Sequence, residues 1–327
     1  MAGHTPARYE ELKAAVAAVR IQFDAAKAAQ PENLAEVLEG VEETPVQIPS
    51  RNGSRTIEGR LYRSTAKDTA ATTGPVPVLV NWHGSGMVFH MFGQDRPFCA
   101  QVAREIPGLV VLDADYRKGP EDPYPAAVHD TEDTLRWLAS QQAVYDVTRV
   151  ALSGFSAGGL LALVAAFTQT FLLVTLAADD ALKQLRIPVV VAVYPPTDLS
   201  VPPKERKQVA RPVRPIPPQM AELFDECYAP DPATRGDPRC SPGRADAALF
   251  PEHVVIVTCG GDNCAPEADA LAARLKKDAQ RKVVHEVMEG MPHAFDKTCQ
   301  PGTPEWEQKD RMNALIVREL KEALRMD

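Results

Sequence analysis

Short apolar runs alternate with longer amphipathic or small-residue stretches over most of this chain. The apolar runs are rich in valine, isoleucine and leucine, which is typical of strands that are buried on both faces of a sheet. The expected strands are Val76–Trp82, Leu109–Asp115, Val150–Ser153, Pro188–Tyr194, Val254–Cys259 and Val283–Met288. The expected helices are Arg96–Glu105, Ala126–Ser140, Ala157–Leu182, Pro266–Ala279 and Glu305–Arg325. This alternation predicts an α/β fold with a mostly parallel sheet covered by helices on both faces.

The N-terminal region and one internal region depart from this alternation. Residues 6–40 space their apolar side chains as helices do, and two runs around Asn52-Gly53, Val46–Pro49 and Thr56–Arg63, predict a hairpin. Eight prolines between Pro195 and Pro218 exclude a regular helix there, and a helix over Gln219–Tyr228 is expected next.

These departures predict a second layer above the core. We expect N-terminal cap helices (1–44) and a cap insertion (198–247) over a core made of residues 45–197 and 248–327. A surface excursion that covers nothing is the alternative for the insertion.

The composition and net charge of the chain limit the kinds of partner that we expect. Of the 327 residues, 45% are hydrophobic and 24% are charged, which is typical of soluble globular proteins. The net charge of −8 argues against nucleic acid and anionic membrane surfaces as partners. The apolar run 160–178 reaches membrane-spanning length, but polar residues interrupt it, so we expect a buried helix. No leader is apparent, which predicts a cytoplasmic location; whether the chain forms a homodimer stays open.

The six cysteines give no metal-binding pattern. None forms a C-x-x-C pair, so neither a metal nor an organic cofactor is expected. Cys227 and Cys240 could form a disulfide in a secreted protein, whereas reduced thiols are expected in a cytosol.

The stretch Gly154-Phe155-Ser156-Ala157-Gly158 carries the most specific chemical signal. It joins an expected strand to an expected helix, so the serine would sit on a sharp turn with its hydroxyl exposed above the sheet. Glycines on both sides of Ser156 avoid collision with the neighbouring strand and helix. We interpret Ser156 as a nucleophile; a structural glycine turn that happens to carry a serine is the alternative.

A second glycine-rich loop, His83-Gly84-Ser85-Gly86, follows the strand that ends at Trp82. Attack by a serine builds negative charge on the carbonyl oxygen, which needs preorganised N–H donors. We expect these donors to be the backbone N–H groups of Gly84, Ser85 and Ala157. His83 precedes the serine and is expected to hold the loop rather than to act as a base; an ordinary strand-ending turn is the alternative.

The base and its supporting acid should follow the nucleophile. Of the seven histidines, His293 lies in a loop beyond a late strand, where its ring could reach the serine. Asp262 closes an earlier strand and would orient that ring. The rival acids are Glu267, Asp269 and Asp296.

These motifs together resemble the hormone-sensitive-lipase-like branch of the α/β-hydrolases. The family's HGGG loop corresponds to HGSG at residues 83–86, and its YRLAPE-x-PFPAA segment corresponds to YRKGPEDPYPAA at 116–127. Its GDSAGG elbow corresponds to GFSAGG at 154–159, and its terminal HGF corresponds to HAF at 293–295. The departures are Ser85, Phe155, Asn263-Cys264 and Ala294, none of which removes a triad member or a backbone donor.

The resemblance implies an α/β-hydrolase fold with a helical cap and a serine carboxylesterase that works through an acyl-enzyme. Short- to medium-chain or small-molecule esters are the expected substrates; a lactone, thioester, amide or secondary-metabolite ester is the alternative. A non-catalytic small-molecule receptor of the same fold is disfavoured because His293 is present. Met87, Val88 and Phe89 are expected to line the substrate pocket; Phe155 either joins them or turns its ring into the core.

Overall fold

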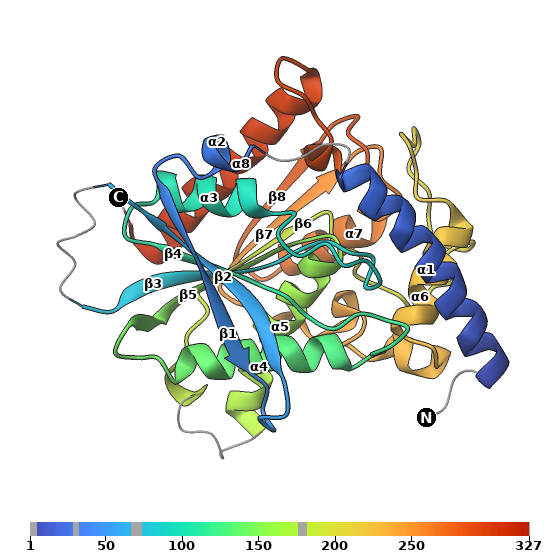
Figure 1. The fold of residues 1–327 in the computed structure, drawn as a ribbon, viewed down its shortest axis with the longest axis horizontal. Helices are drawn as coiled ribbons and strands as arrows, with labels where there is room; N and C mark the ends of the chain where they lie inside the picture. The colour runs from blue at the N-terminus through green and yellow to red at the C-terminus, as the bar shows by residue number, and fades with distance from the viewer. Residues whose placement is uncertain (1–4, 29–32, 67–73, 176–181, 327) are drawn as a thin grey trace.

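A computed structural model describes residues 5–28, 33–66, 74–175 and 182–326 (Figure 1). Its centre is one eight-stranded sheet of order β1-β2-β4-β3-β5-β6-β7-β8. The strands are β1 Val41–Pro49, β2 Thr56–Ser64, β3 Val76–Trp82, β4 Val110–Ala114, β5 Tyr145–Phe155, β6 Val189–Val193, β7 His253–Cys259 and β8 Lys282–Met288. β2 runs antiparallel to both β1 and β4, and the other pairs are parallel. The mostly parallel sheet predicted from the sequence is confirmed.

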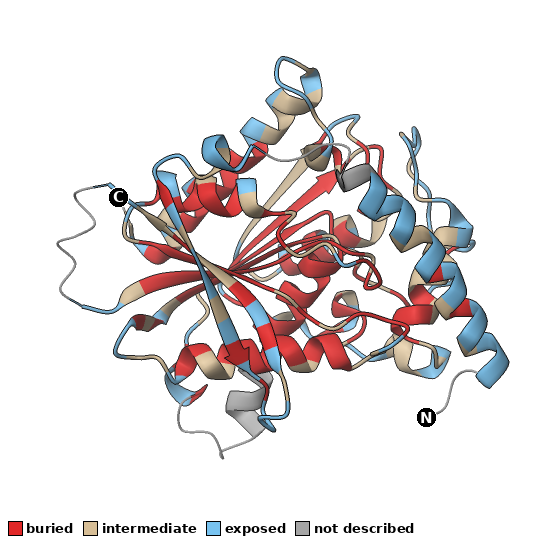
Figure 2. Ribbon diagram, in the orientation of Figure 1, coloured by how far each residue is buried: buried red, intermediate tan, exposed pale blue. Residues whose placement is uncertain are grey.

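Helices cover both faces of this sheet, which explains the continuous apolar runs of its central strands. Helices α3 (Arg96–Glu105) and α8 (Pro304–Leu324) pack on one face, where Leu79 belongs to their cluster. Helices α4 (Ala126–Ala139), α5 (Ala157–Thr175) and α7 (Ala265–Leu275) pack on the other, where Val78 and Val80 contribute. Successive residues of β3 thus enter opposite apolar layers, and the central strands are buried throughout (Figure 2).

The N-terminal region differs from its predicted boundaries. β1 begins at Val41, opposite Ser64 of β2, so residues 41–44, which we assigned to the cap, belong to the sheet. Charged residues and a proline conceal the alternation of this strand, as is usual at the edge of a sheet. The short helix α2 (Leu34–Val37) is fixed to α3, because the Arg104 guanidinium donates to the Val37 carbonyl over 2.8 Å.

Helix α1 (Pro6–Ala28) lies far from α2 and beside α6 (Pro218–Tyr228) (Figure 1). Leu12 and Val16 of α1 pack with Cys227 of α6, and Arg8 pairs with Glu226 over 2.6 Å. The prolines before α6 prevent a regular element there, as expected. The remainder of the insertion forms short 3₁₀ turns at Pro232–Gly236, Pro242–Arg244 and Ala247–Leu249.

Helix α5 begins directly after Ser156, as the elbow motif predicts, and its first three turns are buried. The predicted continuation through 176–181 lies outside the described residues. Among those that are described, no helix combines the length and apolarity needed to cross a membrane.

Candidate active site

The turn that carries Ser156 has the conformation expected of an elbow. Ser156 has a φ of 51°, in the left-handed region, and its N–H donates to the Val193 carbonyl of β6 over 2.8 Å. A methyl group on Gly158 would overlap the carbonyl oxygen of Trp82 in β3. The motif's second glycine is therefore required by the close approach of α5 to the neighbouring strand.

Three side chains from three strand ends meet at this turn. Ser156 follows β5, Asp262 follows β7 and His293 follows β8. With the proton on Nδ1, His293 donates to Asp262 Oδ2 over 2.7 Å, and its Nε2 accepts from the Ser156 hydroxyl over 2.8 Å. The structure thus brings together the three residues that the sequence singled out.

The surroundings of His293 stabilise the protonated form of its ring. Burial opposes the imidazolium, but the charge and hydrogen bond of Asp262, together with the charge of Asp296, outweigh it and raise the pKa of His293. The other Asp262 oxygen accepts from the Cys264 N–H over 3.0 Å, and Asp262 is 1% exposed. The carboxylate is therefore fixed in the orientation that holds the ring.

Each rival acid contacts other groups. Glu267 accepts from the backbone N–H of Thr197 over 2.7 Å. Asp269 lies 3.0 Å from the Nε2 atom of His285. Asp296 accepts from the Tyr194 hydroxyl over 2.7 Å and pairs with Lys297 over 2.8 Å. The Tyr194 ring in turn packs against the His293 ring. Asp296 is therefore linked to the histidine indirectly, through its hydrogen bond with Tyr194.

Hydrogen bonds of buried polar side chains fix the loop after β3. His83 is fully buried, with one ring nitrogen 2.9 Å from the Gly84 carbonyl and the other 3.0 Å from Asp115. The Ser85 Oγ accepts from the Met87 N–H over 3.0 Å and lies 2.7 Å from the Tyr116 hydroxyl. Both side chains hold the loop, as expected for His83.

The loop after β3 passes close to Ser156 at Gly84. A Cβ on Gly84 would stand 3.3 Å from the Cβ of Ser156. Within the described residues, no protein group accepts a hydrogen bond from the backbone N–H of Gly84, Ser85 or Ala157. These donors are available to an oxygen at Ser156.

Lys118 is a supporting residue that sequence reasoning missed. Its ammonium is buried, pairs with Asp115, donates to the Tyr116 carbonyl over 2.5 Å and lies 3.2 Å from His83 Nε2. Burial, opposed by the Asp115 charge, lowers the pKa of Lys118, and burial together with the Lys118 charge lowers the pKa of His83. The signal in the sequence is a lysine at a leucine position of the family's YRLAPE segment.

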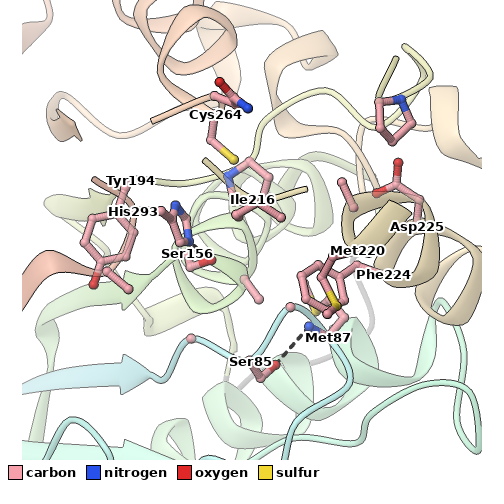
Figure 3. A pocket seen from close by; sticks show the side chains of 18 of the residues that line it. Ser85, Met87, Ser156, Tyr194, Ile216, Met220, Phe224, Asp225, Cys264 and His293 are labelled. Carbon is pink, nitrogen blue, oxygen red and sulfur yellow. Dashed lines mark hydrogen bonds between the residues drawn. The ribbon is translucent and has the colours of Figure 1, made fainter. Parts of the chain in front are cut away.

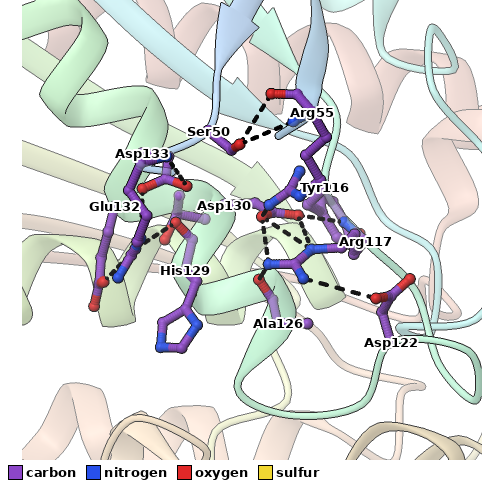
Figure 4. A network of polar contacts seen from close by, with 12 residues as sticks. Ser50, Arg55, Tyr116, Arg117, Asp122, Ala126, His129, Asp130, Glu132 and Asp133 are labelled. Atoms are coloured by element: carbon purple, nitrogen blue, oxygen red, sulfur yellow. Dashed lines mark hydrogen bonds and ion pairs between the residues drawn. The ribbon is translucent and has the colours of Figure 1, made fainter. Parts of the chain in front are cut away.

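A second network fixes the rest of the 116–127 segment (Figure 4). Asp130 of α4 is fully buried and pairs with Arg117 over 2.9 Å and with Arg55 from the turn between β1 and β2. Arg117 also donates to the Ala126 carbonyl over 3.1 Å. The segment that carries Tyr116 and Lys118 is thus tied to a helix and to a hairpin.

A cavity of about 440 Å³ opens above Ser156 (Figure 3). Its walls are mostly apolar and come from α1, α6 and the proline-rich segment before α6 as well as from loops and helices at the strand ends. The lining includes Phe23 of α1, Met87 and Phe89 of the loop after β3, Leu160 of α5, Ile216 of the proline-rich segment, and Met220 and Phe224 of α6. Phe23 and the α6 residues were not predicted, because nothing local in the sequence orients these helices.

Two other residues that were predicted for the pocket, Val88 and Phe155, lie differently from Met87 and Phe89. Val88 does not line the cavity: it is fully buried in the cluster of α1 and α6, so its assignment to the pocket is wrong. Phe155 borders the cavity, but its ring is buried against Phe98 and Tyr194, with centroids 4.9 and 5.9 Å apart. The ring thus turns into the core, the alternative that the sequence left open.

The described residues include one group of three metal-ligating side chains whose donor atoms lie within 4.8 Å of one another: Asp262, Cys264 and His293. Asp262 and His293 are already joined by a hydrogen bond.

All six cysteines are free, so Cys227 and Cys240 do not form a disulfide.

Comparison with known proteins shows which family and fold this chain resembles. A family model described as alpha/beta hydrolase fold matches residues 79–297. The ethyl acetate hydrolase of Pseudomonas putida is 32% identical over 256 residues, which cover 76% of this chain and 74% of that protein. Among solved structures, a bacterial heroin esterase has a TM-score of 0.76 at 24% identity, covering 95% of this chain and 92% of its own. A hyperthermophilic esterase of Pyrobaculum calidifontis has a TM-score of 0.73 at 22% identity, covering 98% of both chains.

Proposed function

The chain belongs to the α/β-hydrolase fold family, and on that premise we propose that it is a serine ester hydrolase with Ser156, His293 and Asp262 as its catalytic triad. The observation that carries the assignment is the pair of hydrogen bonds, 2.8 and 2.7 Å long, that joins the serine to the histidine and the histidine to the aspartate. Nucleophile, base and orienting acid need this sequence of contacts for proton transfer.

Each step uses a group in that chain of contacts. Ser156 Oγ attacks the ester carbonyl carbon while His293 Nε2 accepts the hydroxyl proton, and Asp262 stabilises the imidazolium that forms. The N–H groups of Gly84, Ser85 and Ala157 bind the oxyanion. His293 then gives its proton to the leaving alcohol, which leaves an acyl-enzyme. Water, deprotonated by the same ring, releases the acid and restores Ser156.

The proposed substrates are short- to medium-chain or small-molecule esters. Large side chains from α1, α6 and the loop after β3 close in on a cavity of about 440 Å³, which favours compact acyl and alcohol groups over long triglycerides. The Pseudomonas relative is named for ethyl acetate, which is such an ester. A lactone, thioester or amide would use the same triad.

A cytoplasmic location and a homodimer are separate proposals. Size-exclusion chromatography tests whether the protein is a homodimer.

The test is a panel of p-nitrophenyl esters from acetate to decanoate, with a fluorophosphonate probe to label the nucleophile. We expect hydrolysis of the shorter esters, and labelling mapped to Ser156 by mass spectrometry. Ser156→Ala should lower kcat on the order of 10⁴-fold or more, whereas Ser200→Ala, at an exposed serine outside the cavity, should have no effect. A folded Ser156→Ala protein with more than a few per cent of the activity would refute the assignment, and absence of turnover by the wild type would favour the receptor alternative.

A further inference from the structure

The mostly apolar wall of the cavity holds one carboxylate among the described residues, Asp225, together with Arg206 and Arg214. Asp225 of α6 is 5% exposed and lines the cavity, across it from Ser156 (Figure 3). Met87, Met220 and Phe224 line the cavity as well and lie between the two in that view. A carboxylate in such a place is costly unless its oxygens are hydrogen-bonded.

One Asp225 oxygen has a protein partner, and the other has none among the described residues. The Arg206 guanidinium binds Oδ2 of Asp225 and donates from Nε to the Val201 carbonyl over 3.0 Å. No described residue donates to Oδ1, and this atom is not among the enclosed polar atoms without a partner, so it is accessible at a residue that lines the cavity. Burial, only partly opposed by the charges of Arg206 and Arg235, raises the pKa of Asp225 to about 6. The carboxylate thus has an acceptor position that the protein leaves open.

The charge balance selects the kind of group that would fill this position. Arg206 already neutralises Asp225, so a cationic group would gain little and would approach the guanidinium. A carboxylate would meet the free oxygen with like charge. A neutral O–H donor satisfies Oδ1 without adding a charge to an apolar cavity.

We propose that this cavity binds esters that carry a neutral hydroxyl at the end of an apolar spacer, with the hydroxyl donating to Asp225 Oδ1 while Ser156 attacks the ester. This specificity rests on the proposed function of the triad. It makes Asp225 a specificity-determining residue and Arg206 the group that positions its carboxylate.

The experiment compares substrates that differ only in a terminal hydroxyl or methyl group. One series places the group on the acyl side, as p-nitrophenyl 6-hydroxyhexanoate against heptanoate. The other places it on the alcohol side, as the monoacetate of 1,6-hexanediol against heptyl acetate, followed by acetate release. Spacers two carbons shorter and longer complete each series. In the wild type we expect kcat/KM to be about tenfold higher for the hydroxyl member at the best spacer of one series, the effect of one hydrogen bond to a charged acceptor.

Variants show whether the preference comes from Asp225. The double variant Arg206→Met/Asp225→Leu removes both charges together, and the hydroxyl-to-methyl ratio should fall to about one. In Asp225→Asn the amide oxygen can stay with Arg206 while the NH₂ group faces the cavity, so a terminal ketone should gain over the methyl group. Glu226→Gln, one position along α6 at a residue outside the cavity lining, is the matched control and should keep the wild-type ratio.

Either of two results overturns the proposal: a ratio near one at every spacer in both wild-type series, or a tenfold ratio that survives in the double variant. These outcomes are distinct from failure of the proposed function. If the methyl-terminated esters are turned over and the reaction depends on Ser156, the triad assignment stands even when the hydroxyl preference is absent. If no ester of either kind is hydrolysed, the proposed function itself fails.

Discussion

Replacing Lys297 by methionine should destabilise the protein far more than removal of an ordinary surface lysine. The Lys297 ammonium lies 2.8 Å from Asp95 and 2.8 Å from Asp296, and 3.6 Å from the centre of the Phe155 ring. Its side chain is 13% exposed, and Asp95 is fully buried. Methionine has similar length and no charge, so the change isolates the loss of the ammonium.

The expected loss is about 3–5 kcal/mol, because the change removes the partner of buried carboxylates and leaves their charge uncompensated. A matched control exists on the surface. Lys282 also contacts two carboxylates, those of Glu319 and Glu322, each over 2.7 Å, but its side chain is 42% exposed. Glu319 is 3% exposed, and it keeps Arg318 as a second partner over 2.7 Å when Lys282 is replaced. Lys282→Met should cost no more than about 1 kcal/mol, since water screens the exposed Lys282 and Glu322 and Glu319 is not left without a partner.

Urea-induced unfolding followed by tryptophan fluorescence measures both free energies. Adding Asp296→Asn to Lys297→Met should recover part of the loss, because one of the two stranded charges disappears. Equal losses for Lys297→Met and Lys282→Met, or a loss below about 1 kcal/mol for Lys297→Met, would refute the reasoning that burial makes the Lys297 pairs strong.

The remaining predictions concern the triad and the elbow. Asp262→Asn should lower kcat by about 10⁴-fold on a p-nitrophenyl ester, whereas Asp269→Asn should leave it within twofold; the reverse order would identify the wrong acid. Because the neutral ring must accept the serine proton and the pKa of His293 is raised, kcat/KM should fall on the acid side with a midpoint above pH 6.5. Asp296→Asn removes a negative charge that raises this pKa, so the midpoint should move to lower pH; an upward shift would contradict the assignment. Gly158→Ala should lower the melting temperature and abolish activity, since its methyl group would overlap a carbonyl of β3; wild-type melting would show that the contact is not restrictive.

The sequence predicted the parts of the site that depend on local chain geometry. A strand, a sharp turn and a helix place Ser156 through residues that are adjacent in the chain, so the motif carries the geometry. The contributions of Val88, Lys118, Lys297 and Asp225 depend instead on partners that the fold brings from elsewhere. Val88 looked like a pocket residue because it stands between two that are, but α1 and α6 enclose it. The lysines and Asp225 look like surface charges in the sequence, and only the packed structure shows what each one faces.

The order of the strands sets when during synthesis this site can exist. β3 and β5 lie next to each other in the sheet, and the sheet then extends through β6, β7 and β8 in chain order. His293 stands 137 positions after Ser156, beyond the last strand to be added. During synthesis the chain therefore contains Ser156 well before it contains His293, and on the proposed mechanism the serine has no base until the chain beyond β8 has been made. The proposed triad would thus be completed by the last of its three residues to be synthesised, and a partly made chain that ends before β8 should not hydrolyse esters.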